Sequence, residues 1–161
     1  MLVPFKNLPE ASRIWIYQAN RSFTEQEEQE IAKKLDAFLT QWTAHGANLE
    51  AGYEIRYRRF IIIGLNQETN AASGCSIDAS VHFIQQLEKE YEVDLLDKMN
   101  VTFRNNNTIA YQNLKDFKKA VKQKRISETT IVFNNLVVNK EEYHTYWEVP
   151  ASESWHGRFF R

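Results

Sequence analysis

The feature that most constrains this chain is an apolar run of six residues, 60–65 (Phe-Ile-Ile-Ile-Gly-Leu). It directly follows a segment in which Tyr53, Ile55 and Tyr57 alternate with charged residues. Alternation predicts a strand with one solvated face, whereas a continuous apolar run predicts burial on both faces. We therefore expect residues 53–65 to form one long strand that enters a sheet half-exposed and ends in its middle.

A polar loop, residues 66–74, leads from this strand into a helix that is expected to open at Cys75. The apolar stripe expected on that helix is Ile77, Val81, Ile84, Leu87 and Tyr91. Free backbone N–H groups at the start of a helix point outward and favour anions. The turn at residues 73–78 is therefore the best candidate site in the chain. Its candidate ligand-binding residues are Ser73, Gly74, Ser76, Asp78 and His82.

Cys75, the only cysteine, is the candidate catalytic residue of the same turn. A helix N-terminus favours a thiolate, but the Asp78 carboxylate one turn later opposes negative charge there. His82 lies about 10 Å further along the helix axis, which is too far for direct contact with the thiol. A cysteine-dependent reaction would therefore need a base from elsewhere, either His45 or His156. The structural alternative is a small, half-buried residue in a tight turn.

The remaining elements predict an α+β fold. Thr24 followed by Glu27 is a capping-box signature, a helical apolar stripe follows it, and Gly46 supplies a stop signal. The other expected elements are strands at residues 13–17 and 129–133, a hairpin of residues 100–104 and 108–112 around three asparagines, and a third helix over residues 113–124. The order β-α-β-α-β-β-α-β indicates a single domain with a mixed β-sheet of about five strands and three main helices.

Charge is balanced overall but uneven along the chain. The formal net charge of −1 disfavours nucleic-acid binding as the general role of the protein. Residues 1–97 carry 9 Lys and Arg against 15 Asp and Glu, while residues 98–161 carry 11 against 6. The cations of the third helix and its end are Lys115, Lys118, Lys119, Lys122, Lys124 and Arg125. They form either a solvated helix face or a phosphate-binding patch.

The C-terminal segment is rich in aromatic residues. The last nineteen positions contain Tyr143, Tyr146, Trp147, Trp155, Phe159 and Phe160. Such a segment is expected to pack on the protein's own core or to bury its aromatics against a second copy or another protein partner. A single cysteine forms no internal disulfide, and no apolar run approaches membrane-spanning length. A cytoplasmic protein without a membrane span is therefore expected.

Several classes of site are disfavoured by their missing motifs. The chain has neither a G-x-x-x-x-G-K-[ST] phosphate loop nor a G-x-G-x-x-G fingerprint, so a Walker-type ATPase is disfavoured. The acidic run over residues 88–97 lacks the spacing of a calcium loop, and the four histidines are dispersed. We therefore expect no metal and no cofactor.

Four segments together resemble a family of small bacterial proteins of about this length, whose members often carry the name "ABC transporter ATPase". The segments are residues 13–18 (RIWIYQ), 42–46 (WTAHG), 72–78 (ASGCSID) and 147–152 (WEVPAS). The resemblance covers nearly the whole chain and implies no catalytic residue. The Walker glycines and lysine and any ABC signature motif are absent here, so the family's name does not describe a function of these residues.

These patterns favour a non-catalytic binding module. It is expected to hold a small anionic ligand or a protein partner at the turn of residues 73–78. The alternative is a cysteine-dependent enzyme or redox protein that uses Cys75. A histidine nitrogen within hydrogen-bond reach of the Cys75 sulfur in an open pocket would favour the enzyme.

Overall fold

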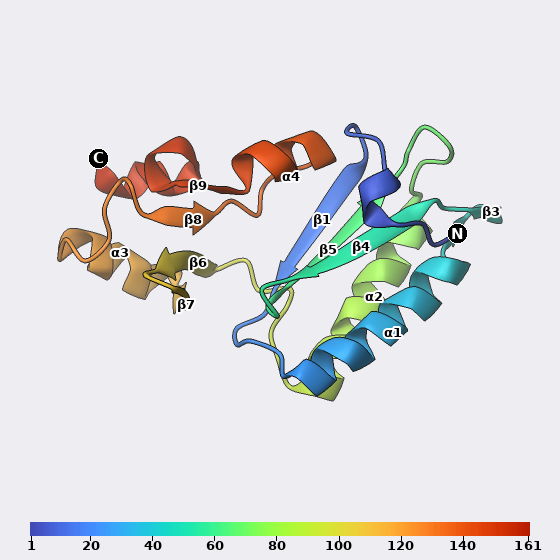
Figure 1. The fold of residues 1–161 in the computed structure, drawn as a ribbon, viewed down its shortest axis with the longest axis horizontal. Helices are drawn as coiled ribbons and strands as arrows, with labels where there is room; N and C mark the ends of the chain where they lie inside the picture. Colours follow the sequence, from blue (N-terminus) through green and yellow to red (C-terminus); the bar gives the residue numbers. More distant parts are fainter. The chain divides into compact units, whose positions relative to one another are not determined.

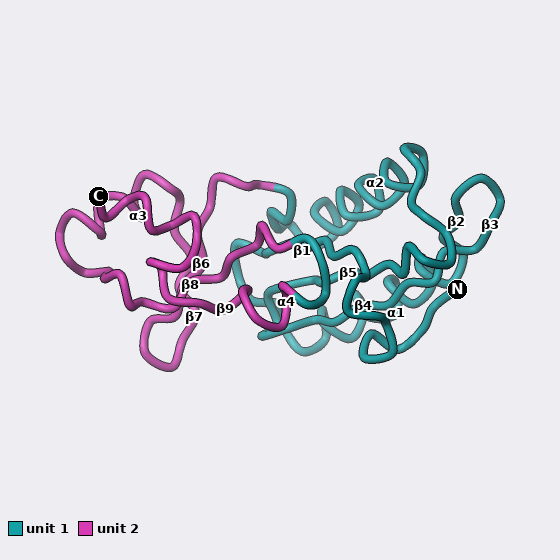
Figure 2. Tube along the Cα trace, turned by 90° about the horizontal axis from the view of Figure 1, so that it is seen from above, with its two compact units in different colours: residues 1–96, 138–141 teal, residues 97–137, 142–161 magenta.

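The computed structural model describes residues 1–161 and divides them into two compact units, shown in Figures 1 and 2. Unit 1 consists of residues 1–96 and 138–141, and unit 2 of residues 97–137 and 142–161. Helices and antiparallel strands occur together throughout the chain, which confirms the α+β class. The boundary near residue 97 coincides with the change from net negative to net positive charge along the sequence, and the behaviour of the two units as a single domain stays a prediction.

Unit 1 is built on a three-stranded antiparallel sheet with the strand order β1-β5-β4. Its strands are β1 (Arg13–Gln18), β4 (Ala51–Arg56) and β5 (Phe60–Leu65). The middle strand, β5, is buried at every residue, whereas the edge strand, β4, is half-buried from Tyr53 to its end. The burial expected from the apolar run is therefore confirmed.

The expectation of one long strand over residues 53–65 is wrong, because the chain reverses at residues 57–59. Tyr57 and Arg58 both adopt positive φ angles, 56° and 50°, and the Arg59 N–H donates to the Arg56 carbonyl over 3.0 Å. Tight turns with positive φ usually carry glycine or asparagine. Residues 57–59 contain neither glycine nor asparagine, so the sequence held no signal for this hairpin.

Two helices, α1 (Glu25–Gln41) and α2 (Gly74–Tyr91), cover one face of this sheet (Figure 1). The expected capping box of α1 is confirmed: Thr24 accepts from the Glu27 N–H, and the Glu27 carboxylate accepts from the Thr24 N–H. Helix α1 ends at Gln41, before the expected stop at Gly46. A small hairpin of β2 (Thr43–Ala44) and β3 (Ala47–Asn48) follows it.

The opposite face of the sheet is covered by the N-terminal segment. The 3-10 helix η1 (Phe5–Asn7) places Phe5 over Gly64, where an added Cβ would lie 2.7 Å from a Leu8 methyl carbon. Residues 138–141 also belong to this unit, since the Ile14 N–H donates to the Val138 carbonyl over 3.0 Å. Burial on both faces explains why β5 is apolar at every position.

Unit 2 contains a four-stranded antiparallel sheet with the order β7-β6-β8-β9. Its elements are β6 (Asn100–Asn105), β7 (Thr108–Asn113), α3 (Leu114–Lys122), β8 (Ile131–Phe133), β9 (Glu148–Pro150) and the 3-10 helices η2 (Ala151–Glu153) and η3 (Trp155–Phe160). A helix α4 (Lys140–Tyr146) precedes β9. The hairpin around the three asparagines is confirmed, with Asn106 at a φ of 58°.

The expectation of one mixed sheet is corrected. The strands form three separate sheets in place of one mixed sheet, and each pair of strands is antiparallel. Strand β9 had no sequence signal, and the tail beyond Pro150 is made of 3-10 helices. Trp155, Phe159 and Phe160 of this tail pack against the core of unit 2. No helix in the chain combines the length and the apolar character needed to cross a membrane.

Candidate functional site

The expected site at residues 73–78 lies at the N-terminus of α2, where Ser73 is the N-cap. Ser73 Oγ accepts from the Ser76 N–H over 3.1 Å, and Ser76 Oγ accepts from the Ser73 N–H over 2.7 Å. The Ser76 hydroxyl also donates to the Ser73 carbonyl over 2.9 Å. Both hydroxyls that were expected to meet a ligand therefore satisfy the start of the helix.

Ser76 faces the protein interior, with only 3% of its surface exposed. Its carbonyl accepts a hydrogen bond from Trp42 Nε1 over 2.9 Å. Ser80 is buried in the same way, while Ile77 and Val81 are half-buried. The buried stripe of α2 thus matches the expected one at Ile84, Leu87 and Tyr91. In the first two turns the buried residues are Ser76 and Ser80, each one position before the residue that was expected.

Two backbone donors of this turn belong to exposed residues. Gly74 and Cys75 occupy the first two helical positions, where N–H groups have no acceptor within the helix. Both residues are exposed, and a Cβ built on Gly74 meets no atom within 4 Å. The first turn of α2 contains no acidic residue, whereas α1 and α3 both carry carboxylates in theirs. The positive end of the α2 dipole is therefore not neutralised by its own sequence.

The loop before this turn is held by side-chain hydrogen bonds that the sequence did not reveal. The Glu50 carboxylate accepts from Asn66 over 3.3 Å and from Thr69 over 2.9 Å. The Asn70 side chain donates to the Asn48 carbonyl over 3.0 Å. These partners lie between 16 and 22 residues apart, so only the fold brings them together.

The other expected site residues are exposed but are not joined to one another. Cys75 Sγ has no hydrogen-bond partner, and no hydrogen bond links Asp78 to His82. His82 Nε2 instead lies 3.5 Å from Gln86 Nε2. Asp78 and His82 therefore flank the turn as separate solvated groups.

Neither histidine proposed as a base is hydrogen-bonded to Cys75. His45 is exposed in the turn between β2 and β3, where its φ is 51°. His156 belongs to unit 2, is fully buried, and places Nδ1 2.6 Å from Ser154 Oγ. The arrangement that would favour a cysteine-dependent enzyme is therefore not observed.

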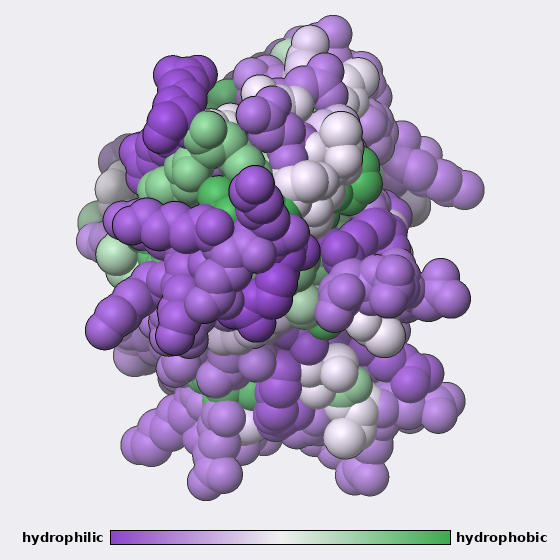
Figure 3. All heavy atoms as spheres, turned by 90° about the vertical axis from the view of Figure 1, so that its left-hand side faces the viewer, coloured by the Kyte–Doolittle hydropathy of each residue, from purple (hydrophilic) through white to green (hydrophobic).

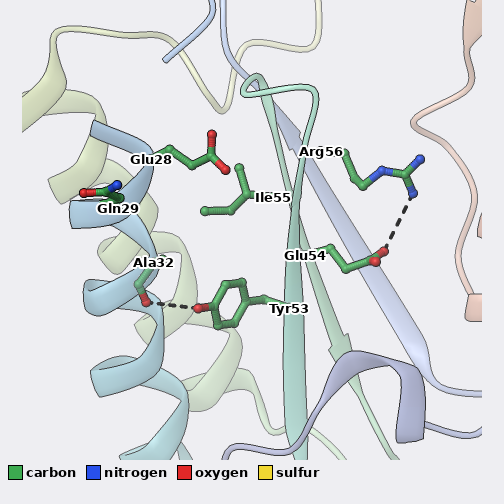
Figure 4. A pocket seen from close by; sticks show the side chains of 7 residues that line it. All are labelled: Glu28, Gln29, Ala32, Tyr53, Glu54, Ile55 and Arg56. Carbon is green, nitrogen blue, oxygen red and sulfur yellow. Dashed lines mark hydrogen bonds and ion pairs between the residues drawn. The ribbon is translucent and has the colours of Figure 1, made fainter. Parts of the chain in front are cut away.

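A groove of about 380 Å³ lies between α1 and β4 (Figure 4). Tyr53 and Ile55 point from β4 toward α1, and Tyr53 Oη donates to Asp36 over 2.7 Å. Burial, together with this bond, raises the pKa of the Tyr53 hydroxyl. On the helix side, the Glu28 carboxylate accepts from Arg58 Nε over 3.0 Å. Tyr53 and Glu28 of this groove are thus already hydrogen-bonded to neighbouring side chains, and a ligand that used either group would compete with those bonds.

A second cavity, about 390 Å³, lies at the C-terminal end of α2, beside the acidic run. The Glu88 carboxylate there accepts from the N–H groups of Leu95 and Leu96, over 2.8 and 3.1 Å. Asp94 accepts from the Asn20 side chain over 3.3 Å. These two carboxylates thus fix the chain that follows α2 through hydrogen bonds. The structure contains no group of three histidine, cysteine or acidic side chains arranged to hold a metal ion.

The sequence matches no protein-family model, no curated protein and no solved structure. The resemblance to the family of small bacterial proteins therefore stays a prediction. Any function has to be argued from the geometry of the chain itself.

Proposed function

We propose that this protein is a non-catalytic binding module that holds a small anionic group at the N-terminus of α2. The observation that carries the proposal is the pair of exposed N–H donors at Gly74 and Cys75, at a helix end without an acidic residue. Donors at the positive end of a helix dipole stabilise phosphate, sulfate or carboxylate groups. The anion is either a free small ligand or an acidic group of a protein partner.

Each residue of the turn has a distinct role in this proposal. Ser73 and Ser76 fix the start of the helix through the capping box, and so orient the two donors. Gly74 leaves open space beside them, because no atom lies within 4 Å of its Cβ position. Asp78 and His82 flank the site one and two turns further on and set its charge.

The test is a titration of the isotopically labelled protein with inorganic phosphate, followed through the amide resonances of Gly74 and Cys75. Both resonances are expected to shift in a saturable manner. The variant Gly74→Pro removes one donor while keeping the helix, since proline is well tolerated at the first helical position. Binding should weaken in Gly74→Pro and persist in the control Gly74→Ala.

A second variant separates binding from helix stability. Cys75→Asp places a fixed carboxylate in the first turn, which should stabilise the helix by about 0.3–1 kcal/mol and repel a bound anion. A rise in melting temperature together with loss of phosphate binding is the expected result. The proposal would be contradicted if titration with phosphate shifted the amide resonances of Gly74→Pro and Cys75→Asp as much as those of the parent protein.

The alternative, a cysteine-dependent enzyme or redox protein, is favoured by one observation: Cys75 is exposed at the second helical position. A thiol there reacts in the folded state if it is used chemically. The variant Cys75→Ser keeps the backbone donor and removes the thiol. The binding module predicts unchanged phosphate affinity in Cys75→Ser, whereas the alternative predicts that its biological activity disappears.

A further inference from the structure

Helix α3 carries a row of lysines on the face that it presents to solvent. Lys115 lies three and four residues before the adjacent pair Lys118 and Lys119, Lys122 lies four and three residues after them, and all four are exposed. This spacing places them on one side of the helix, over about 10 Å of axis. The opposite side is buried through Phe117, Ala120 and Val121.

These cations have no acidic partners. The ion pair within unit 2 joins Arg104 to Glu148 over 2.6 Å, and none involves a lysine of α3. Lys124 and Arg125, directly after the helix, are also exposed and outside any ion pair. Unit 2 carries 10 Lys and Arg against 6 Asp and Glu. Its positive charge is thus concentrated at α3 and is not neutralised by the fold.

The C-terminal 3-10 helix η3 adds a further cation beside the same helix. Lys118 Nζ lies 5.3 Å from the centre of the Phe159 ring, and Arg158 Cζ lies 5.0 Å from the same centre. Two like charges against one ring repel each other, and an anion that lies near both would offset this repulsion. Figure 3 looks at the side of the molecule where α3 and the C-terminus appear in Figure 1, and hydrophilic side chains cover most of that face.

The packing of α3 decides between two classes of anionic partner. A helix that binds a membrane surface inserts its apolar side among the lipids. The apolar side of α3 is already packed in the core of unit 2, where Phe117 is fully buried. The exposed face of α3 therefore presents lysine ammonium groups and no apolar side chains for insertion into a lipid layer. Such a face suits a polyanion dissolved in water.

We propose that the cationic face made by Lys115, Lys118, Lys119, Lys122 and Arg158 binds the phosphodiester backbone of a nucleic acid. About 10 Å of helix spans about three phosphates of one DNA strand at 3.4 Å per phosphate. Lysine ammonium groups contact phosphates without reading bases, so binding is independent of sequence. The net charge of the whole chain does not oppose this, because the acidic residues in excess belong to unit 1.

The test uses the full-length protein and fluorescently labelled 20-mer DNA, single-stranded in one arm and duplex in the other. Fluorescence anisotropy in 50 mM NaCl is expected to give a Kd on the order of 10⁻⁶–10⁻⁵ M. Three phosphate contacts on the duplex predict a slope of about −2.7 in log K against log salt. The decisive variant is Lys115→Glu/Lys119→Glu, which should weaken binding by at least about tenfold.

The matched control is Lys33→Glu/Lys89→Glu, which changes the charge of the protein by the same amount on exposed positions of α1 and α2. It should bind DNA within about twofold of the parent protein. Circular dichroism checks the fold of both variants, and Lys115→Gln/Lys119→Gln replaces the glutamate variant if that one unfolds. Gly74→Pro should leave DNA binding unchanged, which keeps this result separate from the proposed anion site.

Three outcomes would overturn the proposal. They are an absence of DNA binding at 50 mM NaCl with 50 µM protein (at least about five times the expected Kd), an equal loss in the α3 variant and its control, and binding to vesicles with anionic lipids but to neither DNA. Loss confined to the α3 variant, with the predicted salt dependence, would support it.

Discussion

At the residue scale, two glycines differ sharply in their surroundings. A Cβ at Gly52 would lie 2.5 Å from the Val3 carbonyl oxygen and 3.1 Å from backbone atoms of Phe5. At Gly74 it would meet nothing within 4 Å. Gly52→Ala should therefore lower the free energy of unfolding by about 1–3 kcal/mol, whereas Gly74→Ala should raise it by up to about 1 kcal/mol. Urea denaturation measures both, and equal stability of the two variants would contradict the packing described for η1.

A second residue-scale prediction concerns His156 and acid. Its ring is fully buried, stacks on Trp155 at 3.8 Å, and leaves Nε2 without a hydrogen-bond partner. Burial, with a smaller contribution from Arg158, lowers the pKa of His156 from 6.5 to about 4. As pH falls, His156 is therefore protonated at a higher pH in the unfolded chain than in the folded protein. Folding stability is lost as pH falls from about 6.5 to 4. The loss amounts to up to about 3 kcal/mol.

Urea denaturation between pH 7 and 4 checks this window. The variant His156→Gln should lose less stability over that range than the parent protein, whatever its stability at pH 7. The exposed His82 serves as the control, since His82→Gln should retain the full dependence. Glu27, whose pKa the Arg21 side chain lowers to about 2, contributes mainly below about pH 4.5 and equally in the parent and both variants, so the comparison between them is unaffected. Identical pH slopes in the parent and His156→Gln would show that the imidazole is not the titrating group.

At the scale of elements, Lys140 ties the segment of residues 138–141 to the N-terminal segment. Its ammonium group is buried and donates to the carbonyls of Lys6 and Leu8, over 3.1 and 2.7 Å. Lys140→Met keeps the length of the side chain but leaves the Leu8 carbonyl without that donor. A loss of about 1–3 kcal/mol in unfolding free energy is expected. The exposed Lys6 offers a comparison, because Lys6→Met should change stability by less than about 0.5 kcal/mol.

The elements that sequence predicted correctly are those whose ends are set by neighbouring residues. Thr24 and Glu27 cap α1 locally, and the three asparagines supply the turn between β6 and β7. The hairpin at residues 57–59 was missed because tertiary pairing holds Tyr57 and Arg58 at positive φ without a turn residue. Strand β9 has the sequence Glu-Val-Pro, and so short a segment with a charged residue and a proline carries no strand signal, unlike the equally short Ile-Val-Phe of β8.

The position of the candidate site could be predicted from local sequence, but the burial of its serines could not. The turn was located correctly because a strand, a polar loop and a serine N-cap are adjacent in sequence. Ser76 was expected to bind a ligand, yet its hydroxyl donates to a backbone carbonyl over 2.9 Å, as the hydroxyl of the buried Ser80 does over 2.6 Å. A serine satisfied in this way can be buried against a bulky neighbour such as Trp42 at little cost. Hydropathy alone carries no sign of that arrangement.

At the scale of the whole molecule, the aromatic tail is expected to be necessary for stability. Phe117 of α3 is fully buried, and its ring lies 5.7 Å from His156 and 6.0 Å from Phe159. Deleting residues 151–161 exposes this core and removes a tail whose aromatics bury about 150–250 Å² each when fully packed. The free energy of unfolding should fall by several kcal/mol, or the protein should become insoluble. Unchanged melting and solubility after truncation would mean that the tail is dispensable.

The path of the chain predicts how far that damage spreads. Residues 138–141 complete unit 1, yet they lie in the sequence between two segments of unit 2. Unfolding unit 2 frees both ends of this short segment, whose bonds to Ser12 and Ile14 then have to hold it alone. We therefore expect the truncated protein to lose hydrogen-exchange protection at Ile14, which donates to Val138, as well as throughout unit 2.

In the full-length protein, thermal unfolding followed by fluorescence and by circular dichroism should give one coincident transition. Two separate transitions, or full protection of Ile14 in the truncated chain, would show that the units fold independently and would refute the single domain expected from the sequence.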